Sequence, residues 1–205
     1  MKRHTNSFLF ILLLCLFYNC KQEQQQKVVT LPISNERVIN ALTVNKKELV
    51  LNQNQGVWYY KDVPFNGYSE KKNSAGNVIE RLGFYNGKRE GIAKTWSHAG
   101  HLRIKSYYDQ NKLTGLYQSW WENGTLSLQV NYVKGKKQGE ERQWYATGEL
   151  SKVRQLKDGK EDGIQKAWLV NGKLYVNYEA KNGRIFGMKR ANSCYKLEDE
   201  KLVTK

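Results

Sequence analysis

The sequence contains little proline and little cysteine. Pro32 and Pro64 are the only prolines among 205 residues, so proline interrupts no β-strand after residue 64. Of the three cysteines, Cys15 lies in an N-terminal apolar run, Cys20 directly follows that run, and Cys194 stands alone in the body of the chain. If Cys20 is modified, as argued below, no internal disulfide is expected.

Helical periodicity and catalytic signatures are also missing. After the N-terminal apolar run, no stretch places apolar residues at i, i+3 and i+4, as an amphipathic helix requires. The sequence shows no nucleophile–base or acid pair. His98 and His101 have no cysteine or carboxylate cluster at ligand spacing beside them. We therefore predict a helix-poor protein that is not an enzyme and has no metal and no cofactor.

The first 19 residues have the pattern of a signal peptide. Lys2 and Arg3 form a positive n-region, and residues 8–18 form an unbroken apolar run, FLFILLLCLFY, which is too short for a typical spanning helix. Cys20 at its end resembles a bacterial lipobox, in which the thiol is acylated, although Asn19 replaces the usual small residue. The resemblance implies a lipoprotein of the cell envelope, exported and anchored at the outer membrane of a diderm bacterium. The alternative is an ordinary signal peptide cut elsewhere, with Cys20 incidental.

The chain is strongly basic. Its 34 Lys and Arg residues face 19 Asp and Glu residues, and removal of residues 1–19 takes away only two cations and no anion. In a cytosolic protein this charge would suggest nucleic acid. Behind a signal peptide we expect no nucleic acid, and instead an acidic protein, a glycan or an anionic surface as partner.

A 24-residue period dominates the sequence after residue 66. The glycines that mark it are spaced without a slip: Gly67, Gly91, Gly115, Gly139, Gly163 and Gly187. Tryptophan follows five residues later in four of the five units, and a second glycine nine residues later in all five. Twenty-one residues into each unit stands a cation: Lys88, Lys112, Lys136, Lys160 and Arg184. Such columns are the signature of a repeat protein.

Each unit reads as two antiparallel strands and two turns. Asn86-Gly87 and Asn123-Gly124 are dipeptides favoured in tight hairpin turns with positive φ. Residues 126–132 alternate between apolar and polar, as a half-buried strand does. We therefore predict an all-β fold, an elongated single-layer antiparallel meander of β-hairpin repeats. The expected organisation is a signal peptide (1–19), a lipid-anchored linker (20–44), a degenerate repeat (45–66), five repeats (67–187) and a C-terminal cap (188–205).

The repeated columns resemble the MORN repeat in its bacterial variant form. The resemblance rests on the pattern Gly-x4-Trp-x3-Gly-x-Leu…Gly-Lys-x2-Gly and covers residues 67–187 well and residues 45–66 loosely. It implies hairpins stacked into a curved meander. Many bacterial members of the family carry the label YwqK-type antitoxin, and eukaryotic relatives are linked to membranes and scaffold assembly. The matching residues are turn glycines and core aromatics, so they indicate the fold better than the function.

Two repeated features are candidate binding surfaces. The five cations form a row with a step of about 10 Å per unit. The tryptophan column is either core or an aromatic trough. Trp120 and Trp121 are adjacent and must point to opposite faces of a regular strand, so we single out Trp121 as a candidate exposed aromatic residue. A two-residue turn would put the Trp and Leu columns on opposite faces, and a three-residue turn would put them together.

Three functions remain open at this point. The first is a non-enzymatic protein-interaction or scaffold module, tethered to a membrane through Cys20. The second is an antitoxin or immunity protein that neutralises a toxin by direct binding. The third is a binder of cell-wall glycan or anionic lipid, which the cation row and the aromatic row would suit.

Overall fold

The computed structural model describes residues 37–188, 195–198 and 201–204. The chain divides into two compact units, residues 1–36 and 37–205, and the described structure belongs to the second. The predicted signal peptide, Cys20 and Cys194 lie outside the described residues. The described part is almost entirely β-structure, with one short 3-10 turn, η1 (Lys46–Glu48), which confirms the predicted fold class.

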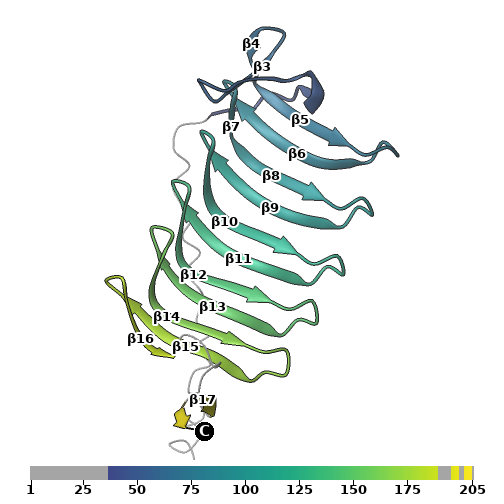
Figure 1. Ribbon diagram of the computed structural model, residues 1–205. Coiled ribbons are helices and arrows are strands. Elements are labelled where there is room, and N and C mark those ends of the chain that lie inside the picture. The colour runs from purple at the N-terminus through teal and green to yellow at the C-terminus, as the bar shows by residue number, and fades with distance from the viewer. Residues whose placement is uncertain (1–36, 189–194, 199–200, 205) are drawn as a thin grey trace, which may run out of the picture. The chain divides into compact units, whose positions relative to one another are not determined.

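The main sheet is a long, open meander whose strands from β5 to β16 follow one another in chain order (Figure 1). All of these neighbours pair antiparallel. One strand departs from the expected pattern, because β1 (Thr43–Asn45) pairs parallel with β5 at the edge. The meander strands are β5 (Gly67–Lys72), β6 (Val78–Tyr85), β7 (Lys88–Arg89, paired with β6), β8 (Gly91–Trp96), β9 (Leu102–Asp109), β10 (Lys112–Trp120), β11 (Leu126–Val133), β12 (Lys136–Trp144), β13 (Leu150–Lys157), β14 (Lys160–Trp168), β15 (Leu174–Lys181) and β16 (Arg184–Met188).

Two-residue turns form one edge of this sheet. Both residues of each turn have positive φ, which defines the type I′ hairpin turn. Asn86-Gly87 is such a turn, as the sequence predicted, and Asn182-Gly183 is another. The other three are Gln110-Asn111, Lys134-Gly135 and Asp158-Gly159. Asparagine, aspartate and glycine tolerate the left-handed backbone best, which explains most of this composition.

Three-residue turns form the other edge. Trp121 N–H bonds to Thr125 O, and Gly124 N–H donates to Trp121 O at 3.0 Å. Gly124 has a φ of 82°, whereas Asn123 is not among the residues with positive φ. The prediction of a positive-φ pair at Asn123-Gly124 is therefore wrong for Asn123. In this longer turn only the last loop residue needs the left-handed conformation.

The turn length places the Trp column beside the Leu column. Trp120 lies directly across from Leu126, and the pair recurs in the other units as Trp96–Leu102, Trp144–Leu150 and Trp168–Leu174. Of the two registers left open by the sequence, the three-residue one is observed. All four tryptophans are half-buried, so they cover part of the sheet without forming its most buried layer.

Three of the unit glycines, Gly115, Gly139 and Gly163, lie at β-bulges within strands. Thr114 pairs with Tyr107 and Gln118 pairs with Lys105, so β10 carries two extra residues between these pairs. Gly115 lies in this interval with a φ of 64°. Equivalent offsets occur around Gly139 and Gly163. A bulge bends the strand, and its left-handed residue favours glycine, which gives a physical reason for the fixed glycine column.

The core is a strip along the middle of one sheet face, which we call the buried column. Each unit contributes one cross-strand pair, and paired residues lie on the same face. Val130 is 1% exposed and Glu141 is fully buried. The five pairs are Ser69–Leu82, Ala93–Ser106, Tyr117–Val130, Glu141–Arg154 and Gln165–Tyr178.

The segment before the first unit folds differently from the five units. Residues 45–66, predicted as a degenerate repeat, contain η1 and a separate sheet of β2 (Val50–Asn52), β3 (Val57–Tyr60) and β4 (Val63–Pro64). Phe65 and Trp58 pack on Phe84, with ring centroids 5.6 and 6.1 Å apart. Val44, within the expected linker, is buried in this cluster. In the expected cap, β17 (Tyr195–Glu198) and β18 (Lys201–Thr204) form an antiparallel pair.

Candidate functional site

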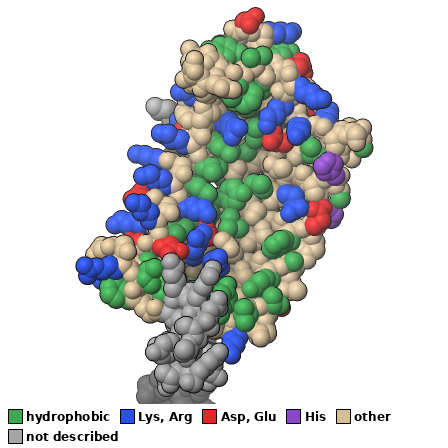
Figure 2. All heavy atoms as spheres, in the orientation of Figure 1, with side chains coloured by type: hydrophobic (Ala, Val, Ile, Leu, Met, Phe, Trp, Pro, Cys, Tyr) green, Lys and Arg blue, Asp and Glu red, His purple; other side chains and the backbone are tan. Residues whose placement is uncertain are grey.

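The five repeated cations occupy equivalent places along the edge of two-residue turns. Each is the residue that directly follows a turn, so the hairpin geometry fixes its position in every unit. Figure 2 shows Lys and Arg side chains gathered along this edge. Lys88 is half-buried, and Lys112, Lys136, Lys160 and Arg184 are exposed. None of the five side chains makes an ion pair or hydrogen bond with another described residue.

Like charges face one another in the last two turns of this edge. Lys157 is the cross-strand partner of Lys160, and Lys181 is the partner of Arg184. Like charges directly opposite one another destabilise a hairpin. The positive sign at these turns therefore does not contribute to folding, and the edge presents cations that are available to an anionic partner.

Trp121 lies at the opposite edge and joins neighbouring units. It is 40% exposed, and its indole Nε1 donates to the Trp144 carbonyl oxygen at 2.9 Å. One unit later, the Tyr145 hydroxyl donates to the Trp168 carbonyl oxygen at 2.7 Å. These bonds connect two of the three-residue turns to the next unit, so Trp121 has a structural role beside the binding role predicted for it.

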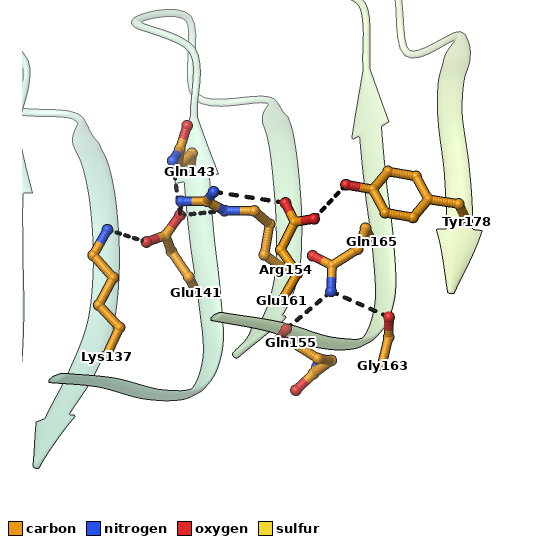
Figure 3. A network of polar contacts seen from close by, with 9 residues as sticks. All are labelled: Lys137, Glu141, Gln143, Arg154, Gln155, Glu161, Gly163, Gln165 and Tyr178. Carbon is orange, nitrogen blue, oxygen red and sulfur yellow. Dashed lines mark hydrogen bonds and ion pairs between the residues drawn. The ribbon is translucent and has the colours of Figure 1, made fainter. Parts of the chain in front are cut away.

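A network of polar residues around the fully buried Glu141, which the sequence analysis missed, crosses the strands of the last two units (Figure 3). Glu141 accepts hydrogen bonds from Lys137 Nζ at 2.6 Å and from Arg154 Nε at 2.8 Å. Gln143 Nε2 also donates to it at 2.9 Å. Arg154 Nη1 lies 4.0 Å from Glu161, whose carboxylate accepts the Tyr178 hydroxyl at 2.7 Å. Four strands, β12 to β15, thus contribute to one connected network.

The network fixes the protonation states of two members. Burial opposes the charged form of Glu141, but the hydrogen bonds and charges of Lys137 and Arg154 outweigh it, so the pKa of Glu141 is lowered. Burial, followed by the Glu161 carboxylate, raises the pKa of Tyr178 to about 12. At neutral pH the Glu141 carboxylate is therefore charged, and Tyr178 is a neutral donor.

Gln165 borders a pocket beside this network. The side chain is 2% exposed, and its Nε2 donates to the carbonyl oxygens of Gln155 at 2.9 Å and Gly163 at 3.1 Å. Its Oε1 has no hydrogen-bond partner among the described residues. The pocket has a volume of about 250 Å³. Its polar lining comes from Lys152, Arg154, Glu161, Gln165, Lys166, Tyr175 and Tyr178.

The repeat alignment itself held a signal for this network. Two residues after each unit glycine stand Ser69, Ala93, Tyr117, Glu141 and Gln165. The change from small or aromatic residues to a carboxylate and an amide is visible in that column. It was missed because the column can be recognised as buried only once the register of the strands is known.

The described part of the chain contains neither a metal-binding cluster nor a helix able to cross a membrane. His98 and His101 are exposed at a turn, and no group of three or more His, Cys, Asp or Glu residues among the described residues is arranged to hold a metal ion. No helix within the described ranges combines the length and apolar character needed to cross a membrane.

Residues 113–134 match the family model of the MORN repeat variant. The matched segment runs from β10 through the three-residue turn and β11 into the next two-residue turn, and so covers about one period. Because the same turns and bulges recur in neighbouring units, the match supports a MORN repeat protein. MORN repeats are in general non-catalytic modules that bind proteins or membranes. A comparison with curated proteins finds no match.

Proposed function

We propose that this protein is a non-enzymatic interaction module that binds an acidic protein along its row of turn cations and is held at a bacterial membrane through an acylated Cys20. The observation that carries the proposal is the row itself. The hairpin geometry fixes the place of Lys88, Lys112, Lys136, Lys160 and Arg184, and no described residue forms an ion pair with any of them.

The spacing of the row favours an extended partner. Two strands per unit separate successive cations by about 10 Å, which is close to the Debye length at physiological salt. Charges at this spacing act jointly on an extended anionic surface and weakly on a small anion. The residue after each cation changes sign and character between units, as in Leu113, Lys137 and Glu161, whereas the cation keeps its sign.

The row is tested by replacing Lys88, Lys112, Lys136 and Lys160 with Gln in one variant. A matched control replaces Lys47, Lys71, Lys72 and Lys173, which are exposed cations away from the row. The parent and each variant are cross-linked in cell-envelope extracts, and the proteins captured by each are quantified. We expect the row variant to lose an acidic interactor that the control retains, with unchanged melting temperatures, and high salt to reproduce the loss.

Three results would change this proposal. Equal loss in both variants would mean that net charge, and not the row, attracts the partner. Retention in the row variant would exclude the row, and Trp121→Ala would then test the opposite edge. Binding of the parent to anionic vesicles, with no acidic interactor, would replace the protein partner by a membrane surface. If the interactor is a toxin whose activity the parent suppresses, the module acts as an antitoxin.

The anchor is tested separately with Cys20→Ser. We expect metabolic labelling with a fatty-acid analogue to mark the parent and not the variant, because a thiol is the acylated group in a lipobox. The variant should leave the membrane fraction or remain unprocessed. Label retained by the variant would exclude acylation at this residue.

A further inference from the structure

The buried column changes its chemistry between the third and the fourth unit. The first three units fill it with apolar residues, tyrosine and serine, whereas the last two place Glu141, Arg154, Gln165 and Tyr178 there. The backbone forms equally well in both parts, so the fold does not require the charged residues. Buried ion pairs often contribute no more stability than apolar residues of the same size. The polar residues therefore call for an explanation other than folding.

The Gln165 amide has one orientation. Its Nε2 donates to two carbonyl oxygens, and a flipped amide would place oxygen against oxygen at both. Oε1 therefore points away from them, toward the side of Glu161 and Arg154 (Figure 3). This oxygen is buried, since Gln165 is only 2% exposed, and it has no hydrogen-bond partner among the described residues. A buried acceptor without a partner is unfavourable, so a ligand with an N–H or O–H donor would gain by supplying it.

The pocket wall also carries excess positive charge. Lys152 lies two residues before Arg154 on β13, is half-buried, and makes no ion pair with another described residue. Arg154 is shared between Glu141 and, more distantly, Glu161. The side of the pocket formed by β13 therefore favours an anion, while Gln165 on β14 requires a donor.

The size of the pocket limits the ligand. A volume of about 250 Å³ corresponds to roughly eight water molecules at about 30 Å³ each. The pocket can therefore hold a ligand about as large as a single amino acid, but not a folded segment of a protein.

We propose that this pocket binds a small carboxylate with an N–H or O–H donor on the adjacent carbon, its carboxylate contacting Lys152 and Arg154 and its donor contacting Gln165 Oε1. Two sources supply this chemistry, a free amino or hydroxy acid and the C-terminal residue of a peptide. The site lies apart from the row of turn cations and does not depend on the function proposed for that row.

The test uses the full chain, extracted with mild detergent and labelled with ¹⁵N. N-acetylglycine and glycolate combine a carboxylate with a donor, acetate lacks the donor, and glycinamide lacks the carboxylate. We expect the first two to shift the side-chain NMR signals of Gln165 Nε2 and Arg154 Nε saturably. Acetate should bind about tenfold more weakly, and glycinamide should produce no shift. Tighter binding of glycine than of N-acetylglycine would indicate a free amino acid, and the reverse a peptide end.

Two variants and one control complete the test. Lys152→Met should weaken glycolate binding by about tenfold or more. Lys157→Met, an exposed cation on the same strand outside the pocket, should leave it unchanged. Gln165→Met should remove the preference for glycolate over acetate. The proposal is overturned if no probe gives a saturable shift, if acetate binds the parent as tightly as glycolate, or if Lys152→Met binds like the parent.

Discussion

The first three units and the last two share one backbone and differ in what they bury. Both parts have the same two turn types, and a Leu or Val stands across the hairpin from the residue at the Trp position in every unit. Yet Tyr117 faces Val130 in the third unit, and Glu141 faces Arg154 at the same positions in the fourth. The glycines and turns therefore specify the sheet, and the buried column can change its chemistry without changing the fold.

The two ends of the sheet also differ in how their turns are covered. Gly87 and Gly183 are the second residues of equivalent two-residue turns, and both have a φ of 72°. A Cβ on Gly87 would meet the Val57 side chain and lie 2.6 Å from the Trp58 carbonyl oxygen, whereas a Cβ on Gly183 would meet no atom of the described residues within 4 Å. The small sheet before the first unit thus packs closely on one turn, whereas nothing in the described ranges covers the last turn.

The largest effect is expected from substitution at the covered turn. Gly87→Ala should lower the free energy of unfolding by about 4 kcal/mol, because left-handed strain adds to a clash with backbone. Gly183→Ala has the strain alone and should lose about 1 kcal/mol. Denaturant unfolding of both variants checks the difference. Equal losses would show that the small sheet does not hold the first turn in place.

Removal of Glu141 should have the next largest effect. Glu141→Ala leaves Lys137 and Arg154 without their shared carboxylate, and we expect a loss of about 3 kcal/mol. The estimate lies at the low end for a buried pair because the Lys137 and Arg154 side chains are 29% and 27% exposed. Gln143→Ala removes one neighbouring donor and should lose about 1 kcal/mol in the same unfolding experiment. A Glu141→Ala loss no greater than that of the control would mean that the network contributes little.

A smaller effect is expected when the pair of the third unit is copied into the fourth. The double variant Glu141→Tyr, Arg154→Val reproduces Tyr117–Val130 and should lie within about 1 kcal/mol of the parent, because apolar pairs replace buried ion pairs at little loss. Each single substitution should be more damaging than the double one, and a double-mutant cycle measures this coupling. A double variant as unstable as Glu141→Ala would show that the two units are not interchangeable.

The period alone predicted the hairpins, the turn at Asn86-Gly87 and the edge on which the cations lie, because each depends only on residues close in sequence. The polar network could not be predicted in the same way. Glu141 faces Arg154 because the strand register shifts by one residue between Trp144 and Gln143, beyond the three-residue turn, and the sequence indicated neither the turn length nor this shift. The parallel pairing of β1 with β5 and the packing of Trp58 on Phe84 are contacts between distant residues, which no local pattern encodes.

Tyr117 in the third unit and Tyr178 in the fifth both have a raised pKa, but the causes differ. The pKa of Tyr117 in the third unit is raised by burial and then by neighbouring tyrosines, whereas that of Tyr178 is raised to about 12 by burial and then by Glu161. Because the folded state holds the Tyr178 proton more tightly than the unfolded chain does, its contribution to stability is complete below about pH 10 and is lost as the pH rises toward 12.

Absorbance of tyrosinate near 295 nm, compared between the parent and Tyr178→Phe, isolates this one hydroxyl. The component that Tyr178→Phe removes should have its midpoint at about 12. In a Glu161→Gln background it should move down, because the acceptor charge is gone and burial alone remains. The Tyr117 component, identified in the same way with Tyr117→Phe, should not move in that background, since no carboxylate contributes to its shift. A Tyr178 midpoint unchanged by Glu161→Gln would contradict the hydrogen bond between them and disconnect β15 from the network.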